Sequence, residues 1–238
     1  MTSPRVPLLL LPGLLCDDEL FAPQVAGLAD VADIHVADLT AHDTMAALAA
    51  DALARVPWSR FALGGLSMGG YVAYEILRQA PARVTALALM DTSARPDSAE
   101  ATENRRRLIA LAQRDFPGVA EALLPKLMTT AHVADERLAA VVRDMATRIG
   151  PAAFARQERA IIGRADSRPS LARIDGPTLV LAGADDALIP REIHEEQAAG
   201  IRGAELAIVA DCGHLSSIEA PDRVNAALRR WLARTSAL

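Results

Sequence analysis

The chain has 238 residues, of which 51% are hydrophobic and only 3% aromatic, so it can build a sizeable core mainly from aliphatic side chains. This hydrophobic content excludes wholesale disorder. The net charge of −5 is spread along the chain, and the absence of a basic stripe argues against a nucleic-acid partner. No apolar run reaches the roughly 18 residues that a membrane-spanning helix needs, so we expect no membrane partner.

The amino-terminal segment begins with a basic residue and an apolar run, as signal peptides do. Arg5 precedes the run 6–15, but two prolines and a glycine interrupt it and no small-residue cleavage site follows. We therefore predict a strand here. Two cysteines, Cys16 and Cys212, are too few for a disulfide framework and match no zinc spacing, which favours a reducing, cytoplasmic location.

Short apolar runs alternate with helical patterns along most of the chain. This alternation is typical of a parallel sheet with helices on both faces, and several runs are apolar at every position, as fully buried strands are. The runs expected to form strands are Val6–Leu11, 34–37, 61–65, 86–90, 178–182 and 206–209. The helices expected to follow most of them are 17–28, 44–55, 68–79, 191–199 and 222–233.

The alternation stops once, between the strand that ends near Thr92 and the strand that starts near Pro177. About 80 residues without a convincing strand are too many for a plain connection. Helical patterns cover most of this stretch, at 98–114, 118–129, 135–149 and 152–162. We predict a helical cap, residues 94–176, inserted into a core made of residues 1–93 and 177–238.

A G-x-S-x-G sequence follows the strand expected at 61–65 and precedes a helical pattern. In this context it predicts a sharp turn that lifts Ser67 clear of the sheet in strained backbone geometry. Gly65 and Gly69 lack the side chains that would collide where the strand and the helix approach each other, and Gly70 extends the clearance. A serine hydroxyl held in this way is a candidate nucleophile, provided that a base lies beside it.

Only one of the five histidines directly follows an expected strand at the edge where this turn lies. His214 stands in the loop after strand 206–209, whereas the others lie in a strand pattern, near or on helices, or in the cap: His35, His42, His132 and His194. We predict that His214 is the base for Ser67. Ser216 and Glu219 have the spacing of a capping box, which would fix the loop that aims the imidazole.

A third group must orient the imidazole and stabilise it when it is charged. Asp185 and Asp186 follow the strand at 178–182, and Asp91 follows the strand at 86–90. All three give the chain order serine, aspartate, histidine, so the residues alone leave the acid open.

Four short segments occur in a fixed order along the chain: LLPGL at 10–14, GLSMG at 65–69, GADDALIP at 183–190 and GHLSSIEAP at 213–221. Together they make essentially the whole chain resemble the α/β-hydrolase family. The resemblance selects Asp186 as the acid, because the family's aspartate stands three residues after the glycine of its loop and four before the proline. A minority of members take the acid from the strand after the elbow helix, which keeps Asp91 as an alternative.

The resemblance also implies a fold and an oxyanion hole. The resemblance implies an α/β fold built on a parallel sheet. Because the first strand begins near residue 6, we expect the sheet to lack the family's first two strands. The six remaining strands should lie in the order 2-1-3-4-5-6. The backbone N–H groups of Leu14 and Met68 are the implied oxyanion donors. Pro12 stands where a histidine commonly precedes the glycine, so the tether of this loop differs. No metal and no organic cofactor is implied.

These parts indicate a serine hydrolase that cleaves a carboxylic ester or lactone of a small molecule through an acyl-enzyme, and the chain most resembles small carboxylesterases and enol-lactone hydrolases. Two alternatives stay open: a cofactor-free perhydrolase or haloperoxidase with the same triad, and a ligand-binding receptor with a vestigial site. Candidates for an apolar pocket are Leu123, Leu127, Met128 and Phe154. Cap arginines are expected mainly in solvent: Arg105, Arg106, Arg107, Arg143, Arg148, Arg156 and Arg159.

Overall fold

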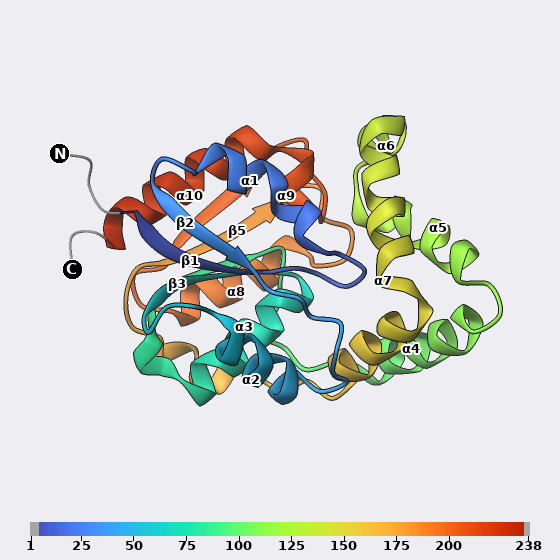
Figure 1. Ribbon diagram of the computed structural model, residues 1–238, viewed down its shortest axis with the longest axis horizontal. Helices are drawn as coiled ribbons and strands as arrows, with labels where there is room; N and C mark the ends of the chain where they lie inside the picture. The colour runs from blue at the N-terminus through green and yellow to red at the C-terminus, as the bar shows by residue number, and fades with distance from the viewer. Residues whose placement is uncertain (1–4, 236–238) are drawn as a thin grey trace.

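A sheet of six parallel strands forms the centre of the computed structural model, which describes residues 5–235 (Figure 1). The strands are β1 (Val6–Leu11), β2 (Ala32–Val36), β3 (Phe61–Leu66), β4 (Val84–Met90), β5 (Thr178–Gly183) and β6 (Glu205–Val209). They lie in the order β2-β1-β3-β4-β5-β6, and every neighbouring pair is parallel. This arrangement confirms the expected sheet and its strand order.

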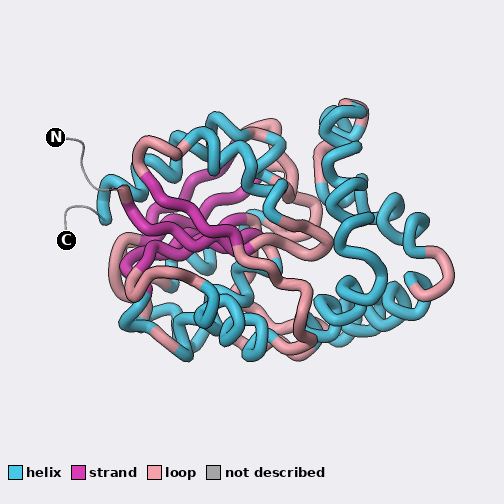
Figure 2. The backbone as a smooth tube through the Cα atoms, in the orientation of Figure 1, coloured by secondary structure: helices cyan, strands magenta, loops and turns pink. Residues whose placement is uncertain are grey.

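Alternate residues of a strand face opposite sides of the sheet, and each side has its own core. On β1, Leu8 and Leu10 pack into one cluster of buried side chains, while Leu9 and Leu11 pack into another. Two layers of helices cover these faces (Figures 1 and 2). The first face carries α1 (Ala22–Gly27) and α10 (Pro221–Thr235), and the second carries α2 (Met45–Arg55), α3 (Met68–Gln79) and α8 (Arg191–Gly200).

The helix expected at 17–28 is wrong as a single element. A short 3-10 turn, η1 (Asp18–Phe21), comes first, and its amino end is capped by the Asp17 carboxylate, which accepts a hydrogen bond from the Glu19 N–H at 3.1 Å. Helix α1 then begins at Ala22 with Pro23 in its first turn. Proline lacks an N–H and crowds the preceding residue, so a new helix starts there instead of the first one continuing.

The stretch between β4 and β5 folds into helices only. They are α4 (Ala99–Ala112), α5 (Phe116–Leu127), α6 (Thr130–Val133) and α7 (Glu136–Ile162), and together we call them the insertion. Two helices expected at 135–149 and 152–162 join in α7 across a kink at Gly150, whose φ is 72°, next to Pro151. The limits of the cap at 94–176 stay a prediction.

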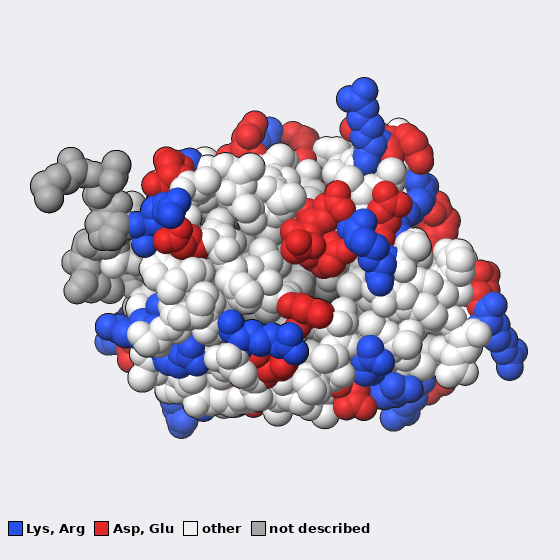
Figure 3. All heavy atoms as spheres, in the orientation of Figure 1, with Lys and Arg blue, Asp and Glu red and all other residues white. Residues whose placement is uncertain are grey.

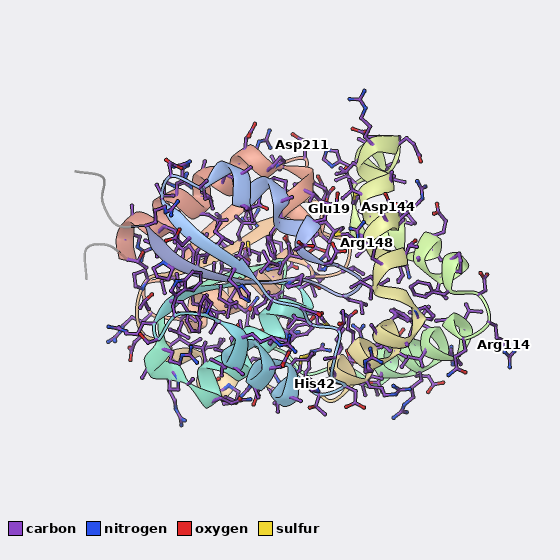
Figure 4. All side chains as sticks on the ribbon, viewed as in Figure 1. Glu19, His42, Arg114, Asp144, Arg148 and Asp211 are labelled. Carbon is purple, nitrogen blue, oxygen red and sulfur yellow. The ribbon has the colours of Figure 1, made fainter. Side chains whose placement is uncertain are left out.

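The insertion lies beyond the edge of the sheet at which the strands end (Figure 1). Arg148 of α7 reaches across to η1, where it donates to Asp17 at 2.6 Å and to Glu19 at 2.5 Å (Figure 4). Acidic and basic side chains are interspersed over this face of the molecule (Figure 3). Within residues 5–235, no helix has both the length and the apolar character to cross a membrane.

Helix α3 lies so close to the end of β1 at Gly69 that the effect of one added methyl group can be predicted. A Cβ on Gly69 would lie 1.9 Å from the Leu11 carbonyl oxygen, so Gly69→Ala must push the helix and the strand apart. We expect the free energy of unfolding to fall by about 3 kcal/mol or more. Chemical denaturation measures this value. Gly163→Ala is the matched control, because its Cβ would meet the Arg159 and Ala160 carbonyl oxygens at ordinary distances of 3.6 and 3.9 Å, and we expect a change below about 1 kcal/mol.

Candidate active site

Ser67 occupies the sharp turn between β3 and α3. Its φ of 53° and ψ of −115° lie in the strained region expected from the sequence. The turn is tight enough that a Cβ on Gly65 would lie 2.4 Å from the Gly69 carbonyl oxygen. The end of β4 fixes it further, since the Ser67 N–H donates to the Met90 carbonyl at 2.9 Å and the Thr92 hydroxyl donates to the Ser67 carbonyl at 2.7 Å. The backbone N–H and the carbonyl of the serine thus each have a partner from β4 or the residues directly after it.

The structure brings together the serine, histidine and aspartate selected from the sequence. His214 Nε2 lies 2.8 Å from Ser67 Oγ, and His214 Nδ1 lies 2.8 Å from Asp186 Oδ2. The other carboxylate oxygen, Asp186 Oδ1, accepts the N–H groups of Leu188 at 2.8 Å and Ile189 at 3.0 Å. These bonds fix one oxygen of the carboxylate while the other faces the imidazole.

The two other aspartates considered for the acid lie elsewhere. Asp185 is exposed on the same loop. Asp91 is fully buried, and its carboxylate accepts the Gly183 N–H at 2.8 Å and the Ser216 hydroxyl. Burial, together with the nearby charge of Asp186, raises the pKa of Asp91 to about 8. Asp91 therefore lies near the site without bonding to the imidazole.

His214 and Asp186 form a charge pair in an almost dry place, with 2% and 1% of their side chains exposed. Burial lowers the pKa of His214, but the Asp186 charge and hydrogen bond, with smaller contributions from Asp91 and Glu219, more than offset it, so the net pKa is raised. For Asp186, burial raises the pKa, whereas the imidazolium charge and the accepted hydrogen bonds lower it below its usual range. Both shifts favour the charged pair.

The loop after β1 lies against the serine. Leu14 lines the same cavity as Ser67, and Met68 is the first residue of α3, so its N–H has no partner within the helix. Leu15 has a φ of 61°, and its N–H donates to Oε1 of the buried Gln157 side chain at 3.1 Å. This contact from α7 supplies a tether for the loop in which Pro12 replaces the usual histidine.

The capping box expected after His214 is present only in part. Glu219 Oε1 accepts the Leu215 N–H at 3.1 Å, as the acidic member of such a box does. Ser216 makes no cap, and its hydroxyl donates to Asp91 instead. The physical reason is that the cap position falls on Leu215, so the serine is turned inward toward a buried carboxylate that needs a donor.

A cavity of about 260 Å³ opens onto Ser67 and His214. A second, smaller space of about 60 Å³ is also bounded by both residues. Of the residues expected to form an apolar pocket, Leu123 and Leu127 line the larger cavity. Met128 and Phe154 do not, because they are buried in the hydrophobic clusters that hold the insertion together. Further apolar or aromatic wall residues are Tyr71, Leu108, Leu188 and Ile189, and polar groups come from Asn104, Lys126 and Glu158.

Arg105 is the one of the seven cap arginines that lines this cavity, and the others lie at the surface or bind the core elsewhere. Its Nη1 donates to Glu158 at 2.7 Å, and its Nε lies 3.3 Å from Asp97. Arg164 also binds Asp97 at 2.7 Å. The guanidinium therefore reaches the cavity with its charge already balanced by carboxylates.

Sequence reasoning missed three polar contributors to the site. Gln157, Arg105 and the buried His194 all lie on helices. Gln157 and Arg105 bind partners 142 and 53 residues away along the chain, whereas the partners of His194 are close in sequence. His194 Nε2 lies 3.2 Å from the Ile189 carbonyl and 3.9 Å from Asp186, directly behind the carboxylate. The pattern of apolar residues along a helix carries no signal for such contacts.

Comparison with known proteins agrees with this architecture. The sequence matches the family described as the alpha/beta hydrolase fold over residues 6–221. A thermophilic esterase from Thermogutta terrifontis, solved with malate bound, is similar with a TM-score of 0.89 and 34% identity, over 98% of this chain and 92% of that one. The enol-lactonase from Burkholderia xenovorans gives a TM-score of 0.87 and 26% identity, over 97% of this chain and 92% of that one.

A curated relative spans nearly the same length. A pimeloyl-[acyl-carrier protein] methyl ester esterase from Xanthomonas campestris pv. campestris is 30% identical over an alignment of 251 positions, gaps included. The alignment covers 95% of this chain and 94% of that protein. With the family match extending over most of the chain, the protein belongs to the α/β hydrolase fold family. The relatives named here are an enol-lactonase and two esterases.

The charge pair predicts the titration of the imidazole. Because Asp186 stabilises the protonated ring, we expect the pKa of His214 to lie above the ordinary histidine value of 6.5. Replacing the carboxylate, Asp186→Asn, removes that stabilisation and should lower the pKa of His214. NMR titration of the histidine ring signals measures both values. Asp185→Asn, an exposed change on the same loop, should leave the His214 titration where it is; an equal shift in that variant would contradict the assignment.

Proposed function

We propose that this protein is a serine hydrolase that cleaves a carboxylic ester or lactone of a small molecule through an acyl-enzyme. At the level of its family, the chain is an ester-cleaving α/β-hydrolase enzyme. The observation that supports the finer proposal best is the continuous hydrogen-bonded path from Ser67 Oγ through His214 to Asp186, which opens onto a cavity.

In the first half of the reaction, His214 Nε2 takes the proton of the Ser67 hydroxyl as the oxygen attacks the carbonyl carbon of the substrate. The negative charge that develops on the carbonyl oxygen is stabilised by the N–H groups of Leu14 and Met68. His214, now charged, is stabilised by Asp186 at 2.8 Å. The imidazolium then gives its proton to the leaving alkoxide oxygen, and the alcohol departs while the acyl group stays on the serine.

In the second half, water attacks the acyl carbon. His214 accepts a proton from this water, the same two N–H groups stabilise the new oxyanion, and the Ser67 oxygen leaves with the proton returned from the imidazole. The carboxylic acid is released and the serine is restored. For a lactone, the alcohol and the acid belong to one molecule, so the first half opens the ring. His214 carries every proton transfer, the backbone N–H groups only stabilise the oxyanion, and the proposed steps use no metal or organic cofactor.

The cavity sets the size and character of the substrate. A volume of about 260 Å³ with mainly apolar walls suits a small acyl or lactone group. The insertion supplies Leu123, Leu127 and Arg105 to these walls, so we propose that residues 94–176 act as the cap that determines specificity. Similar proteins named for esters and an enol-lactone support this substrate class.

The proposal predicts the loss of turnover when the nucleophile is removed. We expect Ser67→Ala to lower kcat/KM by about 10⁴-fold or more on a panel of short p-nitrophenyl esters and small lactones, because no other hydroxyl replaces it. The wild type should also be labelled by a fluorophosphonate probe at Ser67, as read by mass spectrometry. Labelling without turnover would favour a binding protein, and turnover that survives in Ser67→Ala would contradict the proposal.

The role of the acid is tested by a matched pair of carboxylate-to-amide variants. Asp186→Asn keeps the size of the side chain but removes the charge that stabilises the imidazolium, so kcat should fall by about 10²- to 10⁴-fold. Asp91→Asn can still accept the Gly183 N–H and bind the Ser216 hydroxyl, and it should not lose orders of magnitude. Steady-state kinetics on the same esters measures both. A large loss confined to Asp91→Asn would move the acid to that residue.

A further inference from the structure

One buried carboxylate joins the His214 loop to the insertion. The Glu219 side chain has no exposed surface, and each of its oxygens has a partner. Oε1 accepts the Leu215 N–H at 3.1 Å, on the histidine loop. Oε2 accepts the N–H of Thr129, the residue before α6, at 2.9 Å and lies 2.8 Å from Nδ1 of His132 on α6. The two groups of partners are more than 80 residues apart along the chain.

A second contact runs in parallel between the same segments. The carbonyl of Leu127, the last residue of α5, accepts the N–H groups of His214 and Leu215, each at 3.1 Å. Carbonyls in the last turn of a helix have no partner inside the helix, so this bond uses an acceptor that the insertion leaves free. Because the Leu127 side chain lines the cavity, the same residue forms the wall and holds the histidine loop.

The sequence accommodates this junction with a glycine. A Cβ on Gly213 would lie 2.9 Å from Glu219 Oε1 and 3.0 Å from the Thr129 nitrogen, so any side chain there would separate the carboxylate from its donors. A buried carboxylate without donors is costly, whereas charge-assisted hydrogen bonds are among the strongest in a protein. The three donors therefore commit Glu219 to this one position.

We propose that Glu219 is a positioning residue for the candidate base: its carboxylate fixes the His214 loop against the insertion and so sets the place of the imidazole relative to Ser67. The proposal rests on the function proposed above, in which His214 moves the protons. Glu219 touches neither the serine nor the cavity among the contacts described for residues 5–235, so it acts through the loop. As a helix cap alone, Glu219 would only satisfy the Leu215 N–H at the start of α9.

The pKa of His214 is a second quantity to measure, because Glu219 is one of the charged groups near the imidazole. The charged or titratable groups near the imidazole come from four elements: Asp186 before α8, His194 on α8, Asp91 after β4 and Glu219 on α9, with His132 of α6 behind Glu219. Asp186 acts most strongly in raising the pKa of His214, and the Glu219 charge acts in the same direction. Removing the Glu219 charge should therefore lower the pKa of His214, and this titration reports the effect of the carboxylate on the imidazole separately from kcat.

The test is Glu219→Gln in the full chain, beside Glu121→Gln. The amide turns one acceptor oxygen into a donor that faces the donors around it, whereas Glu121 is an exposed carboxylate on α5 bound only to Arg143. With p-nitrophenyl acetate, we expect Glu219→Gln to lower kcat by about tenfold or more, with a smaller change in KM. The acid limb of kcat/KM should move to lower pH, and the amides of Thr129 and Leu215 should exchange faster. Glu121→Gln should match the wild type.

The outcomes separate this proposal from the proposed function. A kcat near the wild-type value with an unchanged His214 titration in folded Glu219→Gln overturns the positioning role. So does a loss of kcat that only follows a fall in melting temperature, with no shift of the pH profile. If Ser67→Ala hydrolyses the ester as well as the wild type does, the proposed function fails instead. Ring NMR titration of His214 and amide exchange then still decide whether Glu219 holds the loop.

Discussion

The contact of backbone with backbone at the turn after β3 is the constraint on which the rest of the site depends. Helix α3 can lie across β1 and β3 only because glycines stand at positions 65 and 69, and this contact forces Ser67 into a positive φ. Strain of this kind costs about 1–3 kcal/mol for each residue and persists only where its surroundings determine it fully. The remaining non-glycine residues with positive φ in the described chain, Leu15, Asp91 and Asp211, also lie just beyond the ends of strands. The strained backbone is thus concentrated at one edge of the sheet.

The core by itself does not hold that edge. Gln157 of α7 binds the loop after β1, and the carbonyl of Leu127 at the end of α5 binds the loop after β6. These two loops flank Ser67, so the insertion contacts both sides of the site as well as lining the cavity. Preorganisation of an active site depends on such supporting contacts, because the reacting groups alone cannot hold their own geometry.

Much of this could be predicted from the sequence, because its signals are local. The fully apolar strands, the glycines around Ser67 and a histidine directly after a strand all act on their immediate neighbours, and parallel strands bring their ends to one edge. Asp186 could be separated from Asp185 and Asp91 only by resemblance, since all three end strands in the right order. Gln157 could not be assigned, because its partner lies 142 residues away and burial of a polar side chain leaves no periodic pattern. For Glu219 the sequence indicated only the local cap, and its contact with Thr129, 90 residues away, left no signal. The prediction of one helix at 17–28 was wrong because Pro23 starts a new helix, and the apolar spacing alone did not indicate this break.

The tether from Gln157 has a consequence for how members of this family diverge. Exchanging one helical cap for another is an obvious route to a new specificity, in evolution or in a designed chimaera. Here a transplanted cap that carried the wrong residue at the position of Gln157 would leave the Leu15 N–H without its acceptor, in a loop that lacks the usual histidine. The insertion of this chain therefore contributes both to the cavity wall and to the support of the loop after β1. Exchanging it for another cap would change both at once.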